Sequence, residues 1–185
     1  LRPTRQLCLA SWWIDGLRLA LDAKRQAETG KIEDAKITAA ALAKHGESMS
    51  KLQAAAGKGG ERSTWNRGFR ALEAIASEIN GRIALAGPPV ARGSAYNWFG
   101  SAADRQQPST MLSPPPILNP MVGRVGEYYL LAKRPQDAVE AFKEALLQFP
   151  NDIDTLKGLL QAYKAANLTK EADETQALIT TLESQ

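Results

Sequence analysis

Apolar residues recur at steps of three and four along most of this chain, and this spacing limits the fold to packed amphipathic helices. The longest run ends at the breaker Gly87-Pro88-Pro89; its members are Trp65, Phe69, Leu72, Ala76, Ile79, Ile83 and Ala86. Ala and Leu together supply 52 of the 185 residues, whereas Val supplies four, which favours helices over strands. We therefore predict an all-α fold.

Two helices are predicted before this run and one after it. Residues 9–28 form the first helix, which Thr29-Gly30 ends. Its predicted apolar stripe consists of Trp13, Ile14, Leu17 and Leu21. The second helix is predicted over residues 32–56, with Ile32, Ala35, Ala39 and Leu42 in its stripe, and another over residues 90–105.

Helix-starting residues divide the last third of the chain into four helices. Asn119-Pro120, Arg134-Pro135 and Asp152 are each followed by a helical pattern. Asn167 is a suitable left-handed residue between the last two helices. The prediction is about eight helices in four antiparallel hairpins.

A self-similarity with a period of 34 residues occupies this part of the chain. The first unit is defined by Val122, Val125-Gly126, Tyr129, Ala138, Phe142, Ala145 and Pro150. The corresponding places of the second unit hold Leu156, Leu159-Leu160, Tyr163, Ala172, Gln176 and Ile179. Here Leu160 replaces the glycine, Gln176 the aromatic residue and Ile179 the second alanine. Small residues at such places permit close approach of helices, and aromatic residues fill the space between them.

This spacing resembles the tetratricopeptide repeat (TPR), whose pattern is Trp, Leu-Gly, Tyr, Ala, Phe, Ala and Pro. The resemblance is strongest over residues 119–184 and implies a right-handed superhelix of antiparallel helix pairs, a TPR-like α-solenoid. The predicted domains are irregular TPR-like hairpins at 1–105, a proline-rich crossing loop at 106–118, and two TPR units at 119–152 and 153–185. A generic helical bundle is the alternative.

Proteins that resemble this family bind a peptide or a partner helix on a concave face lined by the first helix of each pair. That geometry places seven residues on the concave face: Glu127, Leu130, Leu131, Asp154, Lys157, Gln161 and Lys164. Lys157 and Gln161 resemble part of the carboxylate clamp of chaperone-binding members, but the neighbouring unit offers Glu127 instead of a second cation. We therefore predict a protein–protein interaction module without such a clamp.

Two other functions are weighed against this prediction. The first alternative is a structural role, in which the ends of the solenoid stack on another copy or on further repeats of a longer protein. The chain would then be a homo-oligomer or a segment of an assembly. Nucleic-acid binding is suggested by sixteen Lys and Arg against ten Asp and Glu in residues 1–110. These cations are dispersed at helical surface spacing, so we expect a solvated face and no nucleic-acid partner.

The sequence offers no motif for catalysis, and we expect a protein that is not an enzyme and has no cofactor. One Cys and one His form neither an internal disulfide nor a closed zinc site, so we expect no metal ligands. His45 has no catalytic partner in the sequence and is expected at the surface. Gly57-Lys58-Gly59-Gly60 lacks the spacing of a phosphate-binding loop and is interpreted as a turn.

Location is weakly constrained by the sequence. No apolar run approaches the roughly 18 residues that a membrane-spanning helix needs, so we expect no membrane span. The chain begins Leu1-Arg2-Pro3-Thr4 without Met, and we expect a processed or truncated form. Both the cytoplasm and the periplasm stay open as its compartment.

Overall fold

A computed structural model describes residues 9–55, 61–106 and 119–184 of the chain. Within these ranges every regular element is a helix, which confirms the predicted all-α class. The chain divides into two compact units, residues 1–95 and 96–185. The predicted proline-rich loop, apart from Gln106, and the predicted glycine-rich turn lie outside the described residues.

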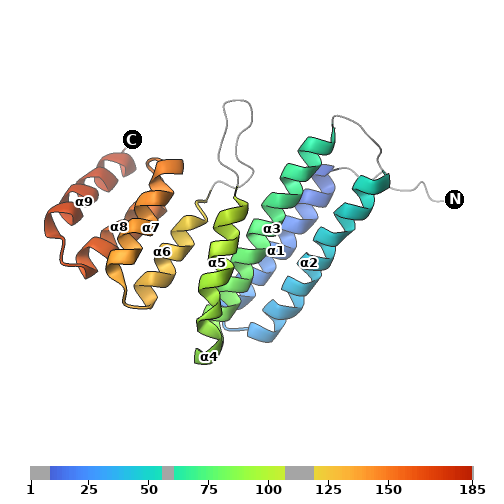
Figure 1. Ribbon diagram of the computed structural model, residues 1–185, viewed down its shortest axis with the longest axis horizontal. Helices are drawn as coiled ribbons and strands as arrows, with labels where there is room; N and C mark the ends of the chain where they lie inside the picture. The colour runs from blue at the N-terminus through green and yellow to red at the C-terminus, as the bar shows by residue number, and fades with distance from the viewer. Residues whose placement is uncertain (1–8, 56–60, 107–118, 185) are drawn as a thin grey trace. The chain divides into compact units, whose positions relative to one another are not determined.

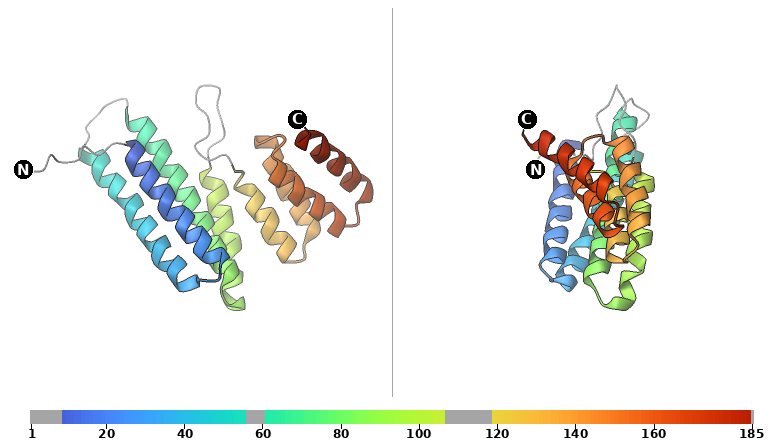
Figure 2. Two further views of the ribbon diagram at one scale, coloured as in Figure 1. Left: turned by 180° about the vertical axis from the view of Figure 1, so that it is seen from behind. Right: turned by 90° about the vertical axis from the view of Figure 1, so that its left-hand side faces the viewer.

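The first unit contains three long helices that each contact the other two: α1 (Leu9–Glu28), α2 (Ile32–Ala55) and α3 (Glu61–Ala86) (Figures 1 and 2). A single helical turn, α4 (Pro89–Arg92), follows α3. Gly30 adopts a φ of 78° between α1 and α2, which confirms the predicted end of the first helix. The predicted stripes of α2 and α3 are confirmed in large part, since Ala35, Leu42, Leu72, Ile79 and Ile83 are buried. The last member of the α3 stripe, Ala86, is instead exposed where the helix ends.

The predicted stripe of α1 is wrong. Its buried face consists of one large residue and four small ones: Trp12, Gly16, Ala20, Ala23 and Ala27. The small residues are buried because α1 approaches its neighbours closely; a Cβ at Gly16 would lie 2.9 Å from Leu72 Cδ2. Ile14 and Leu21, which the sequence placed in the core, are instead 48% and 65% exposed.

Trp12 and His45 join α1 to α2, so the expectation that His45 is a surface residue is wrong. Their rings stack with centroids 5.0 Å apart. Trp12 Nε1 donates a hydrogen bond to the His45 carbonyl oxygen at 3.2 Å, and His45 Nε2 lies 2.8 Å from the Trp12 carbonyl oxygen. The imidazole is half-buried because it covers the indole on the side that faces α2.

Four helices form the main part of the second unit: α6 (Val122–Leu131), α7 (Pro135–Gln148), α8 (Ile153–Ala165) and α9 (Thr169–Glu183). Before them lies α5 (Ser94–Arg105), whose first two residues fall in the first unit. The predicted helix at residues 90–105 is thus two helices, α4 and α5, with Gly93 between them. The described ranges therefore contain eight longer helices, in agreement with the predicted count of about eight, and the single turn α4.

The start of α6 also differs from the prediction. Asn119 does not cap this helix, which begins at Val122 with Met121 before it. The side-chain amide of Gln106 instead hydrogen-bonds to the backbone just before α6. Its Nε2 donates to the Asn119 carbonyl oxygen at 2.9 Å, and the Met121 N–H donates to its Oε1 at 2.7 Å. A buried amide thus satisfies polar groups at the entry to α6.

The helices α6 to α9 alternate in direction, so that α6 and α8 run the same way (Figure 1). Phe142 of α7 lies between two glycines of these parallel helices, and a Cβ added at Gly126 or Gly158 would lie within 2.9 Å of its ring. Leu156, Leu159 and Tyr163 of α8 complete this core. Asn167 has a φ of 60°, which confirms the predicted turn before α9.

Candidate functional site

Four of the seven predicted site residues form one exposed row on α8. Asp154, Lys157, Gln161 and Lys164 follow one another at helical spacing, and all four are exposed. The opposite side of α8 is buried in the core through Leu156, Leu159, Leu160 and Tyr163. The amphipathic pattern therefore fixes which side of α8 meets solvent.

The three predicted residues of α6 lie on the helix that contacts α8, but they differ in exposure. Leu131 is 68% exposed and ends the helix. Leu130 is half-buried and packs against the core around Phe142, so its main contacts are structural. Glu127 is partly exposed and forms an ion pair with Arg124 one turn before it.

Glu127 and Asp154 both line a narrow cleft between α6 and α8. The cleft is also lined by Asn119, Gly123, Asp152 and Thr155. Its free volume is about 10 Å³, which is the space of about one water molecule. A segment bound at this face would therefore lie over the cleft rather than enter it.

The two lysines of the row differ in their surroundings. Lys157 Nζ lies 2.7 Å from Glu183 Oε1 of α9, and hydrogen bonding and charge attraction to Glu183 raise the pKa of Lys157 above its ordinary value. Lys164, in the last turn of α8, has no carboxylate within ion-pair distance among the residues that the structure describes. Lys164 is therefore the cation of the row that is available to a ligand.

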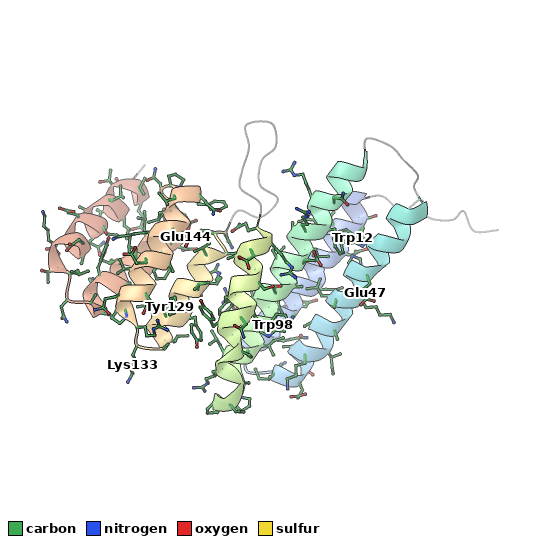
Figure 3. All side chains as sticks on the ribbon, viewed as in Figure 1. Trp12, Glu47, Trp98, Tyr129, Lys133 and Glu144 are labelled. Carbon is green, nitrogen blue, oxygen red and sulfur yellow. The ribbon has the colours of Figure 1, made fainter. Side chains whose placement is uncertain are left out.

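A tyrosine cluster that the sequence analysis did not assign to the site lies at the end of α6. The ring of Tyr96 from α5 lies 5.7 Å from the rings of both Tyr128 and Tyr129 of α6. The guanidinium of Arg134 stands 4.8 Å from the centre of the Tyr129 ring. Figure 3 shows Tyr129 near the end of α6 and Lys133 in the turn that follows.

Hydrogen bonding to Tyr96 raises the pKa of Tyr129 above its ordinary value, and burial adds to the effect. Tyr96 is 42% exposed, and Tyr128 precedes the exposed Leu131 by one helical turn. The sequence signal for this cluster is the Tyr128-Tyr129 pair. The repeat pattern explains Tyr129 as a space-filling residue and leaves Tyr128 without a role.

Comparisons of this chain with protein-family models, with curated proteins and with solved structures found no match. Within the described ranges, no three His, Cys, Asp or Glu side chains are grouped so that they would hold a metal ion. Over the same residues, no helix combines the length and the apolar character that crossing a membrane requires.

Proposed function

We propose that residues 119–184 form a TPR-like protein–protein interaction module that binds a peptide or a partner helix on the face of α6 and α8. The observation that carries this proposal is the exposed row on α8, which lies beside α6 and presents an acid, a paired lysine, an amide and an available lysine. Helices that present such rows side by side suit the recognition of an extended or helical segment.

The packing around Phe142 supports the repeat interpretation. One aromatic ring lies against glycines of two parallel helices, so α6 and α8 both approach α7 closely. Continued stacking of such pairs would produce the right-handed superhelix that the TPR resemblance implies. The concave face of that superhelix would then be lined by α6 and α8, including Leu131, Gln161 and Lys164.

The last helix argues against end-to-end stacking as the main function of this unit. Most exposed positions of α9 are polar: Lys170, Asp173, Glu174, Gln176 and Thr180. Leu178 is the large apolar exception, with 41% of its surface exposed. A polar outer face is what a terminal repeat needs in order to meet water. We therefore assign recognition to the α6–α8 face and no catalytic step to this module.

The proposal is tested by selecting displayed 12-residue peptides on the full chain and measuring their affinities by calorimetry. Lys164→Glu reverses the available cation, and Leu131→Asp removes the exposed apolar side chain. We expect each variant to weaken the selected peptides by about tenfold or more, because charge reversal and loss of apolar contact act directly in the interface. Circular dichroism checks that both variants keep the wild-type helix content.

Lys170→Glu is the matched control, because Lys170 is an exposed lysine of α9 outside the proposed face and has only a long ion pair, 3.9 Å, to Glu174. Lys157→Glu is a poor test, since it would place a second carboxylate beside Glu183 and disturb the fold. Selected peptides that bind the wild type, Lys164→Glu and Leu131→Asp equally would overturn the assignment of the face.

A further inference from the structure

In the first unit, α1 presents an apolar stripe on the side turned away from α2 and α3. Ile14, Leu17 and Leu21 are spaced by three and four residues, and Ile14 and Leu21 are about half or more exposed. The core side of the same helix is already filled by Trp12 and a row of small residues. One helix thus has two apolar sides; on the second side Leu17 is half-buried, whereas Ile14 and Leu21 are exposed among the described residues.

A ladder of alternating charge runs beside this stripe. Asp15, Arg18, Asp22 and Arg25 follow at steps of three, four and three, and each side chain is more than half exposed. Within the helix, Asp15 pairs with Arg18 at 3.6 Å and Asp22 pairs with Arg25 at 2.8 Å. The carboxylates alternate with the guanidinium groups, so the surface repeats the signs minus, plus, minus, plus.

The stripe and the ladder border an open hollow around Leu21. Its lining consists of Arg18, Leu21, Asp22, Lys24, Arg25 and Glu28, and its volume is about 500 Å³. An exposed leucine in a hollow with charged edges suits the side chains of another helix.

We propose that this face of α1 binds the same face of a second copy of the chain, with the two α1 helices antiparallel. A twofold axis level with residue 20 places Arg18 opposite Asp22 of the second copy and Asp15 opposite Arg25. Both pairs occur twice by symmetry, as an isologous contact requires. The apolar stripes then meet near the axis, where Leu21 of each copy lies close to Leu17 and Leu21 of the other.

Charge complementarity selects the antiparallel arrangement and the identity of the occupant. In a parallel pair the twofold axis runs along the helices and places the two ladders on opposite sides of the apolar seam, so none of the four charges meets its complement. A helix of uniform charge would meet repulsion at two of the four positions. When a second copy is placed antiparallel, the same ladder presents the opposite charge at each of the four positions.

The contact is expected to be weak and dependent on concentration and salt. Each copy contributes three large aliphatic side chains, and the ion pairs lie at an exposed rim where each adds little free energy. Salt at about 1 M screens the charge ladder and is expected to shift the equilibrium toward monomer.

Sedimentation velocity of the full chain over a range of concentrations tests the proposal. Arg18→Glu/Arg25→Glu makes the ladder entirely acidic, and Asp15→Lys/Asp22→Lys makes it entirely basic. We expect the wild type to dimerise at high concentration and each variant alone to remain monomeric. An equimolar mixture of the two variants is expected to form a heterodimer, which a mere loss of folding would not produce. Lys31→Glu/Lys36→Glu, which changes two exposed cations outside α1, is the matched control and should dimerise like the wild type.

Spin labels at Glu28→Cys in a Cys8→Ser background test the orientation. Residue 28 lies eight positions from the axis, so antiparallel helices separate the two labelled sites by about 24 Å along the helix axis. Parallel helices would leave them about 10 Å apart. A wild-type chain that stays monomeric up to millimolar concentration, a mixture of charge variants that does not associate, or the short label distance would each overturn the proposal.

Discussion

At the residue scale, Gly158 is the glycine with the least room for a side chain among those the structure describes, since an added Cβ would lie 2.5 Å from two ring carbons of Phe142. Gly158→Ala raises intrinsic helix propensity by about 1 kcal/mol, but the ring or the helix must move to admit the methyl group. We expect a net loss of about 1–3 kcal/mol in the free energy of unfolding, measured by urea denaturation.

Gly100→Ala is the control for this prediction, because a Cβ at Gly100 of α5 meets no atom within 4 Å. There the propensity term acts alone, and the substitution is expected to stabilise the protein by about 0.5–1 kcal/mol. Equal effects of the two substitutions would mean that the contact with Phe142 carries no strain in the alanine variant.

The tyrosine cluster gives a second prediction at this scale. Tyr96→Phe removes the hydrogen bond that is the main cause of the raised pKa of Tyr129, so the pKa of Tyr129 should move down toward its ordinary value of 10.0. Titration of the ¹³Cζ resonances of labelled tyrosine measures this shift. Tyr128→Phe leaves that hydrogen bond in place and should not lower the pKa of Tyr129.

Individual residues also show where sequence reasoning succeeds and fails. The repeat spacing predicts that Gly126 permits close helix approach and that Phe142 fills the space between helices, and in the structure the Phe142 ring lies against Gly126. It missed Gly158, since the 34-residue shift places Leu160 at the glycine position. The apolar periodicity predicts the wrong side of α1, because hydrophobicity favours Ile14 and Leu21 whereas close approach requires Gly16 and Ala20.

At the element scale, α8 is the helix whose start is best defined by its sequence. Asp152 Oδ2 accepts hydrogen bonds from the Thr155 N–H at 2.9 Å and the Thr155 hydroxyl at 2.6 Å. Asp152→Ala removes this cap and should lower the free energy of unfolding by about 1 kcal/mol. Thermal or urea unfolding measures the loss.

Asp154→Ala is the comparison for the cap, because Asp154 lies in the same first turn of α8 but accepts no capping hydrogen bond. Its effect is expected to be a few tenths of a kcal/mol, from the helix dipole alone. If both alanine variants lost the same stability, charge near the helix terminus rather than the cap would be the stabilising factor.

Helix boundaries were predictable where the signal is local and not where it is distant. Arg134-Pro135, Asp152 and Asn167 mark turns through the conformations of their own backbones, and the structure confirms those turns. The start of α6 depends instead on Gln106, which is separated from Met121 by fifteen residues. A local pattern carries no signal of such a contact, so the prediction that Asn119 caps α6 is wrong.

At the scale of the whole molecule, the period of 34 residues predicts which positions of α6 and α8 share a face. The four α8 positions are indeed exposed together. The period does not reveal what their side chains contact, since the Lys157–Glu183 pair joins two helices across 26 positions of sequence. It also gives no reason for α5 to bring Tyr96 onto the end of α6. The chemistry of the face therefore depends on packing that a single sequence does not encode locally.

The Lys157–Glu183 pair is expected to make the stability of the second unit fall at alkaline pH. Because the pKa of Lys157 is raised in the folded state, its contribution is fully present below the unfolded value of 10.5 and is lost as pH rises through the folded value. The raised pKa of Tyr129 acts in the same direction from its ordinary value of 10.0 upward. We therefore expect the free energy of unfolding to fall above about pH 10.

Lys157→Met isolates the lysine in this pH dependence. The difference in unfolding free energy between wild type and variant, measured in urea from about pH 8 to about pH 11, should be constant at first and then shrink above the ordinary lysine pKa. Because the pair is half exposed, salt at about 1 M should reduce the difference at every pH. A difference that is unaffected by both pH and salt would mean that Lys157 stabilises α8 and α9 through the packing of its methylene chain and not through its charge.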